Sequence, residues 1–206
     1  MSKRQVIIGV TGGIAAYKTP ALVSQLVKAD VDVTVVMTAA SHHFAGTATL
    51  TALSGKRVHT ELFDETMPLG AHIELARRAS LLCVVPASAD FMAKAALGLA
   101  DDLLSTLYLA FTGDVFMCPA MNKEMWAHPA VQRNVKTLTE DGVTMIGPDS
   151  GWQSCRVEGT GRMTEPDSIF AKIESYFQEN YKKSPVSLMH GAAKQRSLIN
   201  SAFFNL

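Results

Sequence analysis

The chain of 206 residues carries 19 basic and 19 acidic residues, so its formal net charge at pH 7 is zero, and 48% of its residues are hydrophobic. These values predict a globular protein with enough chain to bury a sizeable core. A balanced charge with no basic stripe argues against nucleic-acid binding, and the lack of a long apolar run argues against a signal peptide or a membrane span.

Short apolar runs alternate with helical patterns along the chain. The runs are continuous, which is typical of strands covered on both faces. The predicted strands are residues 6–10, 33–37, 81–85, 115–118 and 143–147. The predicted helices are residues 15–29, 41–53, 73–79, 89–99, 103–111, 131–141 and 167–183. This alternation predicts an α/β fold with a doubly wound, Rossmann-like or flavodoxin-like parallel sheet.

The pattern shows no linker before about residue 182. We therefore expect a single domain over residues 1–181, with the last amphipathic helix packed against it. Residues 182–206 have no clear place in the pattern. They could be a frayed tail, an oligomerisation arm or a foreign remnant.

The three cysteines are widely separated, which argues against a disulfide framework or a zinc site. Cys83 and Cys118 lie in apolar runs and are expected to be core residues. Cys155 lies in the polar, glycine-rich segment "GWQSCRVEGTGRM". A free thiol in such a loop suits a reducing compartment, so we expect a cytoplasmic protein without a metal site.

Ligands of doubly wound sheets bind beyond the carboxyl ends of the strands. In the first such segment, "GVTGGIAAYK", Gly12 and Gly13 either let amide groups cradle a phosphate or form a tight turn. The spacing is not GxGxxG, and no acidic residue ends the second predicted strand. Both observations favour a mononucleotide over a dinucleotide.

Two later segments carry further candidates. Ser88 either caps a helix or, with Asp90, belongs to a ligand site at a strand exit. His72 in "LGAHIELAR" is either a structural histidine or a general base on a loop that reaches toward the strand exits.

The segment "PAMNKEMW" places a neutral amide among apolar side chains. Asn122 either caps a helix that starts at Lys123 or forms hydrogen bonds to a ligand carboxylate or a flavin ring atom. In the second interpretation, Met121, Met125 and Trp126 form an apolar wall.

Five segments in this order, "GVTGGIAAYK", "GAHIEL", "PASAD", "PAMNKEMW" and "CRVEGTGRM", resemble the homo-oligomeric flavin-containing cysteine decarboxylases. The resemblance covers about residues 5–175, and is strongest to the members that act on 4′-phosphopantothenoylcysteine in coenzyme A biosynthesis. It implies FMN bound between the subunits of a homotrimer, in some members assembled into a dodecamer. By position, the residues that would contact FMN are Gly13, Ile14, Ala15, Thr38, Ser88, Ala89, Asp90, Phe91 and Ala120.

The resemblance also implies an FMN-dependent carboxy-lyase. In this family FMN oxidises the substrate's cysteine side chain to a thioaldehyde, so that loss of CO₂ leaves an enethiolate. His72 would act as base or proton relay, and Asn122 with Met121 would bind the substrate, with its carboxylate held without an ion pair. Cys155 would protonate the enethiolate as reduced FMN returns the two electrons as a hydride, which gives 4′-phosphopantetheine.

The chain departs from the family pattern at two places. Arg156 and Val157 replace a glycine and an acidic residue after Cys155, and Arg156 would bind the substrate phosphate, activate Cys155 or mark a changed substrate. Asp102 stands where many members have asparagine. If the motif is aligned one residue earlier, Asp101 takes this position instead. The ligase domain of many bacterial members is missing, so we expect a monofunctional enzyme.

Two other functions stay open at this point. An oxidative decarboxylase of C-terminal peptidyl cysteine would stop at the enethiol, and would not need Cys155. A non-enzymatic regulatory flavoprotein is the other alternative, although such proteins typically carry long acidic extensions.

Overall fold

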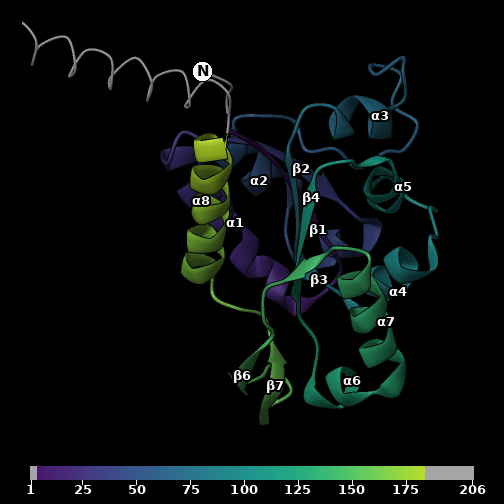
Figure 1. The fold of residues 1–206 in the computed structure, drawn as a ribbon, viewed down its shortest axis with the longest axis vertical. Helices are drawn as coiled ribbons and strands as arrows, with labels where there is room; N and C mark the ends of the chain where they lie inside the picture. The colour runs from purple at the N-terminus through teal and green to yellow at the C-terminus, as the bar shows by residue number, and fades with distance from the viewer. Residues whose placement is uncertain (1–3, 184–206) are drawn as a thin grey trace, which may run out of the picture. The chain divides into compact units, whose positions relative to one another are not determined.

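The computed structural model describes residues 4–183. Five parallel strands form its central sheet, in the order β2-β1-β3-β4-β5 (Figure 1). Their bounds are β1 Gln5–Val10, β2 Asp32–Met37, β3 Leu81–Ala87, β4 Asp114–Pro119 and β5 Thr144–Met145. This order is that of the flavodoxin type, so the predicted fold class is confirmed.

Helices cover both faces of the sheet. α1 and α2 pack together, and on the other side α3 packs with α5 and α4 with α7 (Figure 1). Their bounds are α1 Thr19–Lys28, α2 Thr47–Ser54, α3 Ala71–Ala76, α4 Ala89–Leu97, α5 Leu103–Ala110, α6 Lys123–Ala127, α7 Pro129–Glu140 and α8 Pro166–Lys183. Two 3₁₀-helices, η1 Ile14–Lys18 and η2 Ala39–His43, follow β1 and β2.

The sheet is buried because its strands are apolar on both faces. All seven residues of β3, the middle strand, are buried. Close packing extends to the backbone of β1, where a Cβ on Gly9 would lie 2.8 Å from Leu104 Cδ1 of α5. Cys83 and Cys118 are fully buried in this core, as predicted, and no disulfide joins any of the three cysteines.

The chain divides into two compact units. The first ends at Ile169, and the second begins at Phe170, inside α8. The predicted boundary at residue 181 stays a prediction. The residues assigned to a tail, 182–206, lie outside the described part of the chain except where α8 runs to Lys183.

Two parts of the secondary structure differ from the prediction. The helix predicted over residues 41–53 is divided into η2 and α2, because Gly46 is extended and α2 starts after it. An antiparallel hairpin, β6 Asp149–Trp152 with β7 Glu158–Arg162, was not predicted. Its strands are polar and rich in glycine, so they show no apolar periodicity.

Candidate functional site

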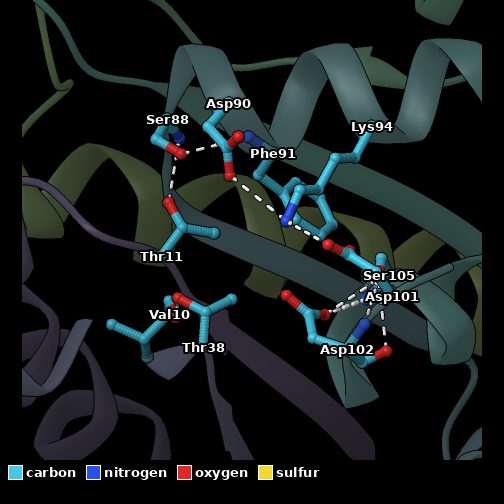
Figure 2. Close-up of polar contacts among 10 residues, drawn as sticks. All are labelled: Val10, Thr11, Thr38, Ser88, Asp90, Phe91, Lys94, Asp101, Asp102 and Ser105. Carbon is cyan, nitrogen blue, oxygen red and sulfur yellow. Dashed lines mark hydrogen bonds and ion pairs between the residues drawn. The ribbon is translucent and has the colours of Figure 1, made fainter. Parts of the chain in front are cut away.

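One buried threonine ties together the exits of β1 and β3. Thr11 donates its hydroxyl to the carbonyl of Pro86 at 2.7 Å. The same hydroxyl accepts the backbone N–H of Ser88 at 2.9 Å (Figure 2). The chain departs to opposite sides of the sheet from β1 and β3, and ligands of such sheets bind at this point. Thr11 therefore fixes the two exits around which a ligand site is expected.

Ser88 caps α4, because its hydroxyl accepts the backbone N–H of Phe91 at 3.2 Å (Figure 2). Asp102 caps α5 in the same way and accepts the N–H of Ser105 at 2.8 Å. The carboxylate at position 102 thus has a local structural role, since it satisfies an N–H that the helix leaves free.

The neighbouring carboxylate, Asp101, pairs with Lys94 of α4 at 3.0 Å, and Lys94 also reaches Asp90 at 3.6 Å (Figure 2). The hydrogen bond from Lys94 lowers the pKa of Asp101, and the same bond raises the pKa of Lys94. Because these carboxylates are well exposed, the network contributes little to stability.

A cavity of about 600 Å³ opens at the strand exits. This volume lies within the roughly 300–1,000 Å³ of small-molecule sites. Eight predicted site residues line it: Gly13, Ile14, Ala15, Ser88, Ala120, Met121, Asn122 and Cys155. Gly12, predicted with Gly13 as a possible phosphate cradle, and Met125, predicted as part of the apolar wall, also line it. The lining residues that sequence reasoning did not assign to the site are Tyr17, Lys18, Trp152, Gln153, Ser154, Gly161, Arg162 and Met163.

Four predicted cofactor residues do not line this cavity. Phe91 is 1% exposed and packs edge-to-face on Tyr108 in the core. Asp90 and Ala89 lie in the first turn of α4, where Asp90 is exposed and pairs with Lys94. Thr38 follows β2 and donates its backbone N–H to Val10 at 3.0 Å.

His72 also lies outside the cavity within one chain. It is the second residue of α3 and half-buried, and its Nδ1 atom is buried without a hydrogen-bond partner among the described residues. Figure 1 shows α3 at the top of the view and the β6–β7 hairpin, which carries Cys155, at the bottom. A single chain therefore does not bring His72 and Cys155 together.

Asn122 has both features that the sequence left as alternatives. It caps α6, since its Oδ1 accepts the N–H of Met125 at 2.8 Å, and it lines the cavity. The bond to Met125 fixes the orientation of the amide. The Nδ2 amino group is therefore left to donate to a ligand.

Two of the three side chains expected in the apolar wall line the cavity, and the third does not. Met121 and Met125 line the cavity, but Trp126 packs against the core and lines a separate hollow. Trp152, at the end of β6, takes its place and is 61% exposed. Trp152 could not be assigned to the site from the sequence, because its strand has no apolar periodicity.

Two cations at the cavity share one carboxylate. Lys18 Nζ lies 2.7 Å from Glu165 Oε1, and Arg162 contacts the same oxygen. The hydrogen bond from Lys18 is the main reason that the pKa of Glu165 is lowered. Only 13% of the Lys18 side chain is exposed, so this ion pair is partly shielded from water. One positive charge is left over, which suits an anionic ligand.

Arg156 lies outside the cavity, at the turn of the hairpin. It has a φ of 66°, in the left-handed region, and its N–H donates to the carbonyl of Gln153 at 2.9 Å. Glycine adopts this conformation without steric cost. The conformation therefore explains why the family pattern places glycine here.

The described residues offer neither a metal site nor a membrane-spanning helix. Within residues 4–183, no three side chains of the His, Cys, Asp or Glu type gather as a metal ion would require. None of the helices described is both long and apolar enough to cross a bilayer.

Comparisons with known proteins agree with this geometry. A family model described as Flavoprotein matches residues 1–178. The coenzyme A biosynthesis bifunctional protein CoaBC of Haemophilus influenzae is 40% identical over 201 residues, which cover 97% of this chain and 50% of that protein. The chain thus spans about half the length of the curated relatives it matches.

Solved structures give the same result. A cysteine-to-serine mutant of PPC decarboxylase, complexed with pantothenoylaminoethenethiol, has a TM-score of 0.79 and 30% identity over 85% of this chain and 99% of that one. The FMN-dependent cysteine decarboxylase SpaF has a TM-score of 0.74 and 31% identity over 84% of this chain and 97% of that one.

Proposed function

Because the chain belongs to the Flavoprotein family, we propose that it is an FMN-dependent decarboxylase that converts 4′-phosphopantothenoylcysteine to 4′-phosphopantetheine. The observation that carries this proposal is the single cavity that joins Gly13 and Ser88 with Asn122 and Cys155. The names of the CoaBC relative and of the PPC decarboxylase neighbour support the same substrate.

The residues of the cavity fit FMN. A Cβ on Gly13 would meet no other atom within 4 Å, so this glycine faces open space and its backbone is free to approach a phosphate. Met121 and Trp152 offer apolar surface for a flavin ring system. Bound FMN would supply the two-electron oxidation of the substrate thiol that makes the carboxylate labile.

The protein's own groups then handle charge and protons. Asn122 would hold the substrate carboxylate with its Nδ2 amino group. A neutral donor binds this carboxylate less tightly than a cation would, and so opposes CO₂ release less. Cys155, at the rim of the cavity, would give its proton to the enethiolate that is left.

The substrate phosphate needs a cation, and the geometry favours Lys18 and Arg162 over Arg156. Lys18 and Arg162 line the cavity, whereas Arg156 does not. An incoming phosphate would compete with Glu165 for both cations. Charge-assisted hydrogen bonds of this kind are about twice as strong as neutral ones.

We propose further that the active protein is a homo-oligomer, as a trimer or a dodecamer, in which His72 of one protomer completes the cavity of its neighbour. The separation of α3 from the hairpin supports this (Figure 1). So does the exposure of Ile14, Tyr17 and Trp152 around the cavity, at 55%, 61% and 61%. We place the enzyme in the cytoplasm, where a reducing environment keeps the Cys155 thiol free.

A peptidyl-cysteine decarboxylase is the second candidate, because the chain is also similar in structure to the peptidyl-cysteine decarboxylase EpiD, with a TM-score of 0.70 and 25% identity over 82% of this chain and 97% of that one. The position of Cys155 in the cavity counts against it, since release of the enethiol requires no proton donor there. The test is to purify the protein, record its visible spectrum and incubate it with 4′-phosphopantothenoylcysteine. A flavin absorbance and a product lighter by one CO₂ are expected.

The two-chain site has its own test. His72→Asn and Cys155→Ser chains are each expected to form no 4′-phosphopantetheine, since the first lacks the base for thiol oxidation and the second lacks the proton donor and releases the enethiol. Mixed oligomers of the two would regain formation of 4′-phosphopantetheine, because some of their cavities combine an intact His72 with an intact Cys155. Mixed oligomers as inactive as the single variants would contradict the shared site.

A further inference from the structure

Gln153 is a buried polar side chain between the two segments that carry the proposed chemistry. It follows β6, two residues before Cys155, and is only 7% exposed. A buried amide is costly unless its hydrogen bonds are satisfied. Its partners therefore show what holds it there.

The two ends of this amide bond different segments. Its Oε1 accepts the backbone N–H of Lys123, the residue after Asn122, at 3.1 Å. The same oxygen lies 3.6 Å from Cys155 Sγ and accepts the thiol proton, a length suited to sulfur. Its Nε2 donates to the carbonyl of Gly159 in β7 at 3.3 Å.

The backbone of Gln153 organises the turn that contains the thiol. Its N–H donates to the carbonyl of Val157 at 2.9 Å, and its carbonyl accepts the N–H of Arg156 at 2.9 Å. Both backbone groups of Gln153 thus bond residues that follow Cys155, and these two bonds close the loop that contains the thiol. Cys155 itself is exposed, so few packing contacts hold its side chain.

Two glycines let the hairpin lie directly on the Asn122 segment. A Cβ on Gly161 would lie 2.4 Å from the carbonyl oxygen of Met121 and 3.1 Å from Gln153 Nε2. A Cβ on Gly159 would lie 2.6 Å from Lys123 Cδ. Beside the backbone hydrogen bond from Met121 to Gly161, the Gln153 amide links the two surfaces through its side chain.

We propose that Gln153 is a positioning residue: its amide oxygen fixes the Cys155 thiol relative to Asn122, so that the proton donor faces the carbon from which CO₂ has left. This inference rests on the proposed function. It adds that the fate of the enethiolate depends on a residue that does not take part in the proton transfer. One oxygen serves both segments, so movement of either one displaces the other.

We expect the product to change when Gln153 no longer positions Cys155. If Cys155 is misplaced, the enethiol leaves before it is reduced, and the product has lost CO₂ and two hydrogen atoms. The two electrons taken from the substrate then pass from the flavin to dioxygen, so one H₂O₂ forms for each enethiol released. With Cys155 in place, the electrons return to the product and only CO₂ is lost.

The experiment compares Gln153→Met, which keeps the length but removes both polar atoms, with Gln153→Glu, which keeps an acceptor. Under air, Gln153→Met is expected to raise the enethiol share of the product at least tenfold, with matching H₂O₂. Gln153→Glu is expected to retain mainly the product that has lost CO₂ alone. The control is Gln132→Met, since Gln132 donates to the carbonyl of Trp126 and does not touch Cys155.

A second readout does not depend on activity. In flavin-free protein, iodoacetamide should alkylate Cys155 at least threefold faster in Gln153→Met than in wild type or Gln132→Met, because the thiol is no longer held by Oε1 and is free to reach the reagent. Cys83 and Cys118 are buried and do not compete. This readout remains decisive even if wild-type protein forms no product, in which case the proposed function fails separately.

Two results would overturn the assignment. One is a Gln153→Met protein that gives wild-type products and wild-type alkylation. The other is Gln153→Glu behaving like Gln153→Met in both assays, because the acceptor oxygen would then not be what positions the thiol. If Gln153→Met does not fold, Gln153→Glu and Gln153→Asn take its place in the alkylation assay. Equal rates in these two and wild type would also contradict the proposal.

Discussion

The backbone N–H of Met121 donates to the carbonyl of Gly161 at 2.9 Å. This bond joins the segment after β4, which carries Asn122, to β7 of the hairpin, whose loop carries Cys155. The two segments are about forty residues apart in the sequence. The first follows β4 and is positioned by the central sheet, whereas the second belongs to the separate hairpin. The hairpin is thus the element that completes the cavity, and it supplies the proposed proton donor.

Gly13→Val should block flavin binding without unfolding the protein. A Cβ at position 13 would meet no protein atom within 4 Å, and Gly13 lines the cavity, so a valine side chain would extend into it. The flavin absorbance of the purified variant should fall at least tenfold, with an unchanged thermal transition in flavin-free protein. Gly46→Val is the control, since Gly46 also faces open space but lies outside the cavity. Full flavin content in Gly13→Val would contradict the site.

Asn122→Asp separates the capping role from the binding role. Aspartate caps helices as well as asparagine, so the free energy of unfolding should change little. The added negative charge would repel the substrate carboxylate, and decarboxylation should fall by at least a hundredfold. Asn122→Ala should instead lose the cap, at about 1 kcal/mol of stability. Chemical denaturation and product assays check both. An active Asn122→Asp enzyme would leave Asn122 with its structural role alone.

Lys18→Met should weaken recognition of the substrate phosphate. Loss of one charge-assisted hydrogen bond of about 1.5–3 kcal/mol predicts a rise in KM of about tenfold or more. The KM for pantothenoylcysteine without the phosphate should not change, and this comparison is the measurement. Lys28→Met, at an exposed lysine of α1, serves as control. Equal effects on both substrates would place the phosphate elsewhere.

Arg156→Gly should stabilise the protein. A non-glycine residue in the left-handed region costs roughly 1–2 kcal/mol, and Arg156 has a φ of 66°. A gain of about 1 kcal/mol corresponds to roughly 2–4 °C in Tm for a chain of this size. Asp30→Gly is the matched control, because Asp30 also has a positive φ but aspartate tolerates it better. A lower Tm for Arg156→Gly would mean that the arginine side chain holds the hairpin in another way.

We expect the protein to lose stability at acidic pH because of His59. Burial, followed by the charge of Arg57, lowers the pKa of His59 below its ordinary value, and its Nδ1 has no hydrogen-bond partner among the described residues. Below about pH 6.5 the unfolded chain takes up a proton that the folded chain cannot bind until its lower pKa is reached. The free energy of unfolding should therefore fall as pH is lowered through this window. Above the window, His59 should cause no further change of this free energy with pH.

Denaturation at about pH 7.5 and about pH 5.5 measures the effect, and His59→Gln should reduce the difference between the two values. His43→Gln, at an exposed histidine, should leave the difference as in wild type. An unchanged difference in His59→Gln would assign the pH dependence to other groups.

The sequence predicted those parts of the protein that depend on apolar periodicity and on turn residues. The five strands and the helix caps at Ser88 and Asn122 follow from such local signals. Trp152 could not be predicted as part of the cavity, because the exposed hairpin follows no hydrophobic pattern. Position along the motif also failed to separate a core side chain such as Phe91 from the cavity-lining Ser88, since Ser88 is the extended N-cap residue before α4 whereas Phe91 lies within the helix and is buried.

The central claim is that this chain removes only CO₂ from 4′-phosphopantothenoylcysteine. The most direct measurement is the product mass from purified, flavin-loaded protein, given this substrate or a peptide that ends in cysteine. We expect a product lighter by one CO₂ from the first substrate, without H₂O₂, and no product from the peptide. A product that has also lost two hydrogen atoms, or turnover of the peptide in place of the small thiol, would contradict it.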